Sequence, residues 1–83
     1  MGYILTRHAA DVVEARNIKQ QWLDRVIEAP EKVESEMEDG DLEHRLGRIA
    51  ENGNRVLRAV LNIRSKPEQV VTAYFDRSMR SKL

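Results

Sequence analysis

The chain has 83 residues and a mass of 9.6 kDa, with 14 basic and 14 acidic side chains and a 41% hydrophobic share. This length supports a single domain over residues 1–83 and excludes two. No apolar run approaches the roughly 18 residues needed to cross a bilayer, and the N-terminus lacks the order of a secretory signal. We therefore expect a cytoplasmic protein without a membrane partner.

The residue types present also limit the chemistry. The chain contains no cysteine, which excludes disulfides, thiolate catalysis and Cys-built zinc sites. Its two histidines, His8 and His44, are too far apart in sequence to suggest a metal motif. The sequence therefore predicts neither a metal site nor a cofactor.

The zero net charge is the sum of two unlike halves. Residues 1–43 carry five basic against eleven acidic side chains, and residues 44–83 carry nine against three, so the halves have charges of −6 and +6. Such asymmetry indicates an ionic partner, or halves that neutralise each other in the fold. Neutrality argues against indiscriminate polyanion binding but leaves room for a local phosphate site in the second half.

The first third of the chain predicts one short strand and two helices. Residues 3–6 are apolar and β-favouring, and Thr6 can cap a helix that runs through Arg16, with Asn17 as its left-handed stop. A second helix begins at Ile18 and ends by Ala29, because proline follows. Its apolar face comprises Trp22, Leu23, Val26 and Ile27.

The rest of the chain predicts four strands joined by tight turns, over residues 32–38, 42–50, 55–64 and 69–75. In the first of these, Val33, Ser35 and Met37 alternate with glutamates, which is typical of a half-buried strand. Residues 76–83 have no apolar period and are expected to form a flexible basic tail. The predicted fold is α+β: an N-terminal strand and a two-helix hairpin packed on one face of an antiparallel meander sheet.

An arginine set on this meander is the strongest candidate site. Arg58 and Arg64 share one face of the predicted 55–64 strand, and Arg45 or Arg48 on the neighbouring strand can lie beside them. The guanidinium fork matches phosphate oxygens and can stabilise charge that develops on a phosphodiester. Alternatively, the arginines pair across strands with the glutamates of the acidic strand, Glu34, Glu36 and Glu38.

Other groups could move protons or contact a base. His8 lies where the first strand becomes a helix, and its pKa range suits general acid or base work, although a structural capping role is commoner. Thr72 and Tyr74 share a face of the last strand, where Tyr74 could donate a hydrogen bond or stack on a base, or could lie at a core margin. His44 is a weaker candidate.

Several short segments match, in order and spacing, a known bacterial family. These are residues 6–9 (TRHA), 16–18 (RNI), 29–30 (AP) followed by Val33, 55–60 (RVLRAV) and 71–74 (VTAY). Over nearly the whole chain they resemble the family called domain of unknown function 4258. That family is similar in layout to the RelE, ParE and BrnT toxins of type II toxin–antitoxin systems, which implies a RelE-like arrangement of helices on a sheet.

The resemblance also implies roles for residues. It selects His8, Arg16, Arg58 and Thr72 as family-pattern positions. In RNA-cleaving relatives, sheet arginines hold the scissile phosphate, and a His or Tyr near the end of the last strand assists proton transfer. Here the catalytic set would comprise His8, Arg45, Arg58, Thr72 and Tyr74, and the RNA-binding set Arg64, Arg77 and Arg80.

The leading hypothesis is therefore a metal-independent, mRNA-interferase-like ribonuclease whose partners are RNA and an antitoxin protein. The alternative is a non-catalytic interaction module that binds a charged protein partner through its basic sheet or its acidic half. The sequence leaves the oligomeric state open.

Overall fold

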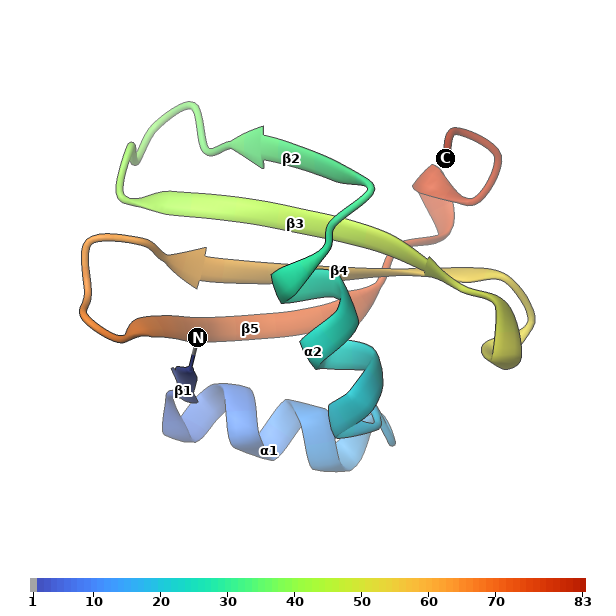
Figure 1. Ribbon diagram of the computed structural model, residues 1–83, viewed down its shortest axis with the longest axis horizontal. Helices are drawn as coiled ribbons and strands as arrows, with labels where there is room; N and C mark the ends of the chain where they lie inside the picture. The colour runs from blue at the N-terminus through green and yellow to red at the C-terminus, as the bar shows by residue number, and fades with distance from the viewer. Residues whose placement is uncertain (1) are drawn as a thin grey trace.

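In a computed structural model, which describes residues 2–83, the chain forms an α+β fold with two helices and one five-stranded sheet (Figure 1), as predicted. The helices are α1 (Arg7–Ala15) and α2 (Gln20–Glu28). The strands are β1 (Tyr3–Leu5), β2 (Lys32–Ser35), β3 (Leu42–Ile49), β4 (Arg55–Asn62) and β5 (Glu68–Phe75). Two single-turn 3₁₀ helices, η1 (Ala50–Asn52) and η2 (Arg77–Met79), follow β3 and β5.

The sheet is mixed, with the strand order β1-β5-β4-β3-β2. Strands β2 to β5 are antiparallel, whereas β1 runs parallel to β5, with Tyr3 opposite Glu68 and Leu5 opposite Val70. The predicted antiparallel meander therefore describes four strands and not the whole sheet. Apolar, β-favouring residues identified β1 as a strand, but residue types carry no information about which distant strand pairs with it, or in which direction.

The helix ends follow from local side-chain chemistry. Thr6 Oγ1 accepts a hydrogen bond from the Ala9 amide at 3.1 Å, which confirms the predicted N-cap of α1. Asn17 adopts a positive φ of 55°, the expected left-handed stop. The second helix begins at Gln20 and not at Ile18, because Ile18 is buried in the short connection between the helices.

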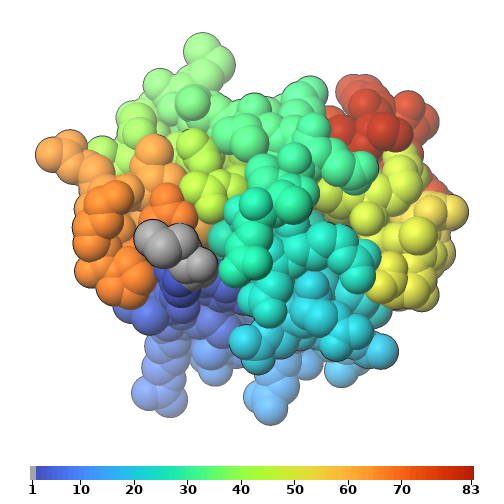
Figure 2. Space-filling view, in the orientation of Figure 1, coloured from blue at the N-terminus to red at the C-terminus, as the bar shows by residue number. Residues whose placement is uncertain are grey.

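The main core lies between the two helices and the sheet. Helix α1 packs against β5, and α2 packs against β3 and β4 (Figure 1). Figure 2 shows α2 (teal) at the centre of this face, between the turn at residues 63–67 (orange) and the turn at residues 50–54 (yellow). The core side chains are Ala9, Ile18, Trp22, Leu23, Val26, Ile27, Ile49, Leu57, Ala59, Leu61, Val70 and Ala73.

A glycine allows α2 to approach the sheet closely. A Cβ atom on Gly47 of β3 would lie 3.1 Å from Val26 Cγ2, which is too tight for a relaxed side-chain contact. The absence of a side chain at this position therefore fixes the spacing between α2 and β3.

The opposite face of the sheet is partly covered by the C-terminal segment. Met79 of η2 is buried and packs with Leu46, Val56 and Leu83. Arg48 ties this segment down by donating hydrogen bonds of 2.6 Å to the carbonyl oxygens of Arg80 and Leu83. Residues 76–83, expected to be a flexible tail, are therefore packed on the sheet, because one methionine and one leucine suffice to cover Leu46 and Val56.

Strand β2 is shorter and more exposed than the alternation predicted. It ends at Ser35, and Val33 and Met37, expected to be half-buried, are 50% and 98% exposed. The reason is tertiary: β2 is the end strand of the sheet, and α2 covers β3 and β4 instead. In the described part of the chain, neither helix has the length and apolar content to traverse a bilayer.

Candidate functional site

The two arginines expected to hold a phosphate together lie on opposite faces of the sheet. In the register between β3 and β4, Arg45 is opposite Ala59, whereas Arg58 is opposite Leu46. Cross-strand partners share a face and neighbours along a strand alternate, so Arg45 projects toward the helices and Arg58 toward the other face. The structure therefore does not bring these two guanidinium groups together.

Arg45 is held by carboxylates on the helix-covered face. Its Nε donates to Glu43 Oε1 at 2.7 Å, its Nη2 to Glu68 Oε2 at 3.1 Å and its Nη1 to the Ile27 carbonyl at 3.1 Å. Burial opposes the charged form, but the hydrogen bonds to Glu43 and Glu68 outweigh it and raise the pKa of Arg45. This side chain joins the C-terminal end of α2 to β3 and β5, which is a structural role.

Arg58 is the centre of an ion-paired network on the other face. Its side chain is only 10% exposed, its Nη2 lies 2.8 Å from Asp76 Oδ2, and its Nη1 donates to Glu34 Oε1 at 3.0 Å. The hydrogen bond from Arg58 is the main cause that lowers the pKa of the Glu34 carboxyl. The sequence left two roles open for Arg58, phosphate binding and ion pairing with the acidic strand. The structure shows the ion pairing, with Glu34.

His44 completes this network, and sequence reasoning gave it little weight. Its Nε2 lies 2.6 Å from Glu36 Oε2, and its Nδ1 lies 2.7 Å from the Nη1 of Arg58. Since a guanidinium only donates, Nδ1 accepts and we assign the proton to Nε2, which donates to Glu36. The pairing of His44 with Glu34 in the β2–β3 register creates this site. Alternation within one strand could not reveal it.

Tyr74 and Thr72 lie on the same sheet face as Arg58. Tyr74 of β5 is directly opposite Arg58, and Thr72 is opposite Val60. Both side chains are half-buried. Of the residues expected to be catalytic, Tyr74 and Thr72 are thus near Arg58, and Arg45 is not.

His8 and Arg64 are placed away from this network. His8 is exposed in the first turn of α1. Arg64 is 77% exposed and makes a 3.3 Å ion pair with Asp41 at the turn after β4. The structure therefore does not gather the predicted catalytic and RNA-binding residues into a single site.

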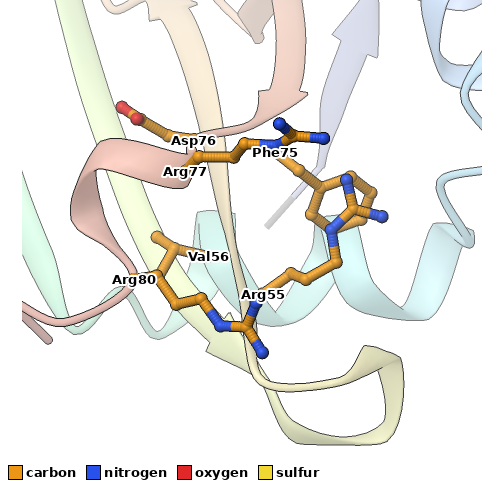
Figure 3. Close-up of a pocket in the computed structure, with 6 residues that line it drawn as sticks. All are labelled: Arg55, Val56, Phe75, Asp76, Arg77 and Arg80. Atoms are coloured by element: carbon orange, nitrogen blue, oxygen red, sulfur yellow. The ribbon is translucent and has the colours of Figure 1, made fainter.

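Three other arginines converge where β4 begins and β5 ends (Figure 3). Arg55 of β4, with Arg77 and Arg80 of the C-terminal segment, lines a hollow of about 440 Å³ together with Val56, Phe75 and Asp76. Within residues 2–83, none of the three arginines forms an ion pair. Figure 3 shows the Asp76 carboxylate turned away from them. This carboxylate accepts a hydrogen bond of 2.9 Å from Arg58 Nε.

The arginines of this hollow are positioned by contacts other than carboxylates. The Arg55 guanidinium lies over the Phe75 ring, 4.5 Å from its centroid. Arg80 Nη2 donates to the Gly53 carbonyl at 3.1 Å. Phe75 itself packs edge-on against the buried Trp22, with ring centroids 6.2 Å apart. Part of the site therefore rests directly on the core.

A second hollow adjoins the first and shares two of its residues. Arg55 and Phe75 line it together with Arg16 and Tyr74. Arg16 is fixed by a 2.7 Å hydrogen bond from its Nη1 to the Ala73 carbonyl, on the part of β5 that β1 does not cover. The two hollows together are called the arginine concavity, lined by Arg16, Arg55, Val56, Tyr74, Phe75, Asp76, Arg77 and Arg80.

The arginine concavity offers positive charge and planar groups. Its four guanidinium groups form no ion pair with any acid of residues 2–83. They therefore favour an anion, and Arg forks suit phosphate oxygens in particular. In the part of the chain that the structure describes, no cluster of His, Asp and Glu is placed to hold a metal ion. Arg77, Arg80 and Tyr74 were candidates from the sequence, whereas Arg55 was missed and Arg16 stood out only as a family-pattern position.

The chain matches one known protein family. The profile of the family described as domain of unknown function, DUF4258, matches residues 5–75. The chain belongs to the DUF4258 family. The resemblance to this family seen in the sequence is thus confirmed.

The DUF4258 match contains part of the arginine concavity. Arg16, Arg55, Tyr74 and Phe75 lie within the matched residues, and Arg77 and Arg80 follow directly after them. No curated protein and no solved structure matches this DUF4258 chain.

Proposed function

We propose that this DUF4258 domain binds RNA through the arginine concavity and acts as a toxin-like, metal-independent ribonuclease of a toxin–antitoxin system. The observation that carries the proposal is the convergence of four arginines without carboxylate partners around Phe75 and Tyr74. All other arginines of the predicted site are paired with acids. A second support is the layout of helices on one side of a sheet, which resembles that of RelE-like toxins.

Cleavage at this site would use charge stabilisation and the Tyr74 hydroxyl. The 2′-hydroxyl of the RNA attacks the adjacent phosphorus, the bond to the 5′-oxygen breaks, and a cyclic phosphate forms. Arginines hold the phosphate and stabilise the extra charge of the transition state. Tyr74 would hand its phenolic proton to the departing 5′-oxygen, and solvent would accept the proton of the 2′-hydroxyl.

A non-catalytic interaction module is the second candidate, and one observation favours it. The residues that line the arginine concavity include no histidine, and their one carboxylate, Asp76, is bound to Arg58. A surface that only binds needs no general base. In that case the same arginines would hold an acidic segment of a partner protein.

The binding step is tested by the double variant Arg77→Ala/Arg80→Ala, measured by fluorescence anisotropy with a labelled single-stranded RNA. Loss of two phosphate contacts should weaken binding at least tenfold and reduce the slope of log affinity against log salt by about 1.4, at roughly 0.7 per contact. Arg64→Ala/Lys66→Ala is the matched control, because it also removes two positive charges, from exposed positions in the turn after β4. Equal losses in both variants would refute the site.

The catalytic step is tested separately by expression from a tight promoter. Wild-type protein should slow growth and degrade RNA, and Tyr74→Phe should degrade it at least a hundredfold more slowly, the lower end of a general-acid contribution of roughly 10²–10⁴. RNA binding by Tyr74→Phe should stay within twofold of wild type. A wild-type protein that binds RNA but neither slows growth nor cleaves it would support the interaction module instead.

A further inference from the structure

The stacked pair of Arg55 and Phe75 is an exposed planar platform. The guanidinium lies 4.5 Å from the ring centroid, and the ring is held from behind by its edge-on contact with Trp22. Arg55 is exposed, so the guanidinium that lies over Phe75 is also accessible to solvent. Such a plane offers a stacking surface for a nucleobase.

Two further positive charges lie beside the platform, in addition to that of Arg55. Arg77 and Arg80 come from the C-terminal segment and line the same hollow of about 440 Å³, within the range of small-ligand sites. Arg80 is fixed twice, by its own hydrogen bond to the Gly53 carbonyl and by that of Arg48 to its backbone. A planar group on Arg55 can therefore have its attached anion near Arg77 and Arg80.

The one acid in the hollow does not oppose this arrangement. Asp76 accepts hydrogen bonds from Ser78 and from Arg58, and the first of these is the main cause that lowers the pKa of its carboxyl. Its charge is thus directed to the opposite side of the segment (Figure 3). The platform and the two arginines face the ligand without a competing carboxylate.

From these observations, and resting on the proposed RNA-binding function, we infer that the hollow recognises one unpaired nucleotide. Its base stacks on the solvent-accessible Arg55 guanidinium, and its phosphate lies between Arg77 and Arg80. Bases in a duplex are already stacked on their neighbours and cannot occupy the platform. The domain is therefore selective for single-stranded over double-stranded RNA.

The inference is tested by comparing three labelled ligands at one salt concentration: a single-stranded RNA of ten nucleotides, the same sequence as a duplex, and an abasic strand of equal charge. Wild-type protein should bind the single strand roughly 5- to 150-fold more tightly than the abasic strand, the range expected for one stacked base. It should bind the duplex no better than the abasic strand. Equal affinity for all three would overturn the inference.

Arg55→Lys separates stacking from charge, because lysine keeps the positive charge and lacks the planar group. This exposed substitution should abolish the preference for the strand with bases over the abasic strand. Arg64→Lys, at a distant exposed position, should leave that preference unchanged. A preserved preference in Arg55→Lys would overturn the platform. Failure of wild type to bind any RNA would instead refute the proposed function, so the two failures are distinguishable.

Discussion

The sequence pointed to Arg58 as a phosphate ligand. The structure instead predicts that replacing Arg58 lowers the stability of the fold. Arg58→Ala removes the ion pairs with Glu34 and Asp76 and the contact with His44. Each hydrogen bond to a charged group contributes roughly 1.5–3 kcal/mol to the free energy of unfolding. The loss is reduced because Glu34, 35% exposed, can be hydrated again, whereas Asp76, 14% exposed, cannot be fully.

We therefore expect Arg58→Ala to lower the free energy of unfolding by about 2–4 kcal/mol, near or below the 3–5 kcal/mol of a fully buried pair. In a domain of this size that corresponds to a decrease in Tm of roughly 8–32 °C, at 4–8 °C per kcal/mol. Urea unfolding followed by the fluorescence of the single tryptophan, Trp22, measures it, since this side chain is buried in the folded state.

Arg64→Ala is the control for this experiment as well. Its ion pair with Asp41 is exposed, so its loss should change stability by less than about 1 kcal/mol. An Arg58→Ala variant as stable as Arg64→Ala would refute the structural role. If that stable variant also lost RNA affinity, Arg58 would be a ligand-binding residue, as the family resemblance implied.

Two further predictions concern pH and the C-terminal segment. The Arg25 guanidinium lowers the pKa of Glu51 to about 2, below the ordinary value of 4.5, so this pair stabilises the fold above pH 4.5 and the contribution is lost as the pH falls toward 2. Tm measured by circular dichroism should therefore fall less steeply over this range in Glu51→Gln than in wild type; parallel curves would contradict the pairing. Met79→Ala should lower the free energy of unfolding by about 2 kcal/mol in urea titrations, because it removes the side chain that packs on Leu46 and Val56 and leaves a cavity. Unchanged stability would mean that this segment does not hold to the sheet.

The hairpin register explains why the candidate site was only partly predictable. Arg77 and Arg80 were recognised as basic residues after the last strand, but Arg55 was not associated with them. Phe75 lies opposite Leu57, so the chain after β5 continues past the start of β4, next to Arg55. A register shift between Val60 and Leu61 changes the pairing along the β4–β5 hairpin. No periodicity in a single strand records such a shift.

The amino-acid sequence by itself determined the local structure. The cap at Thr6, the stop at Asn17 and the period-two strands depend on contacts within a few residues, so neighbouring side chains suffice to predict them. The charge asymmetry between the two halves was equally visible in the sequence.

Only the tertiary structure decided which charges remain unpaired. The register of β3 against β4 turns Arg45 and Arg58 to opposite faces, and each meets carboxylates from segments distant in sequence. Each of these two arginines is neutralised by one carboxylate from the acidic half and one from the basic half. Within residues 2–83, the arginines around Phe75 form no ion pair: Arg16, Arg55, Arg77 and Arg80. Ion pairing acts over a few ångströms in space. These distances are set by the strand register. They cannot be inferred from the separation of the residues along the sequence.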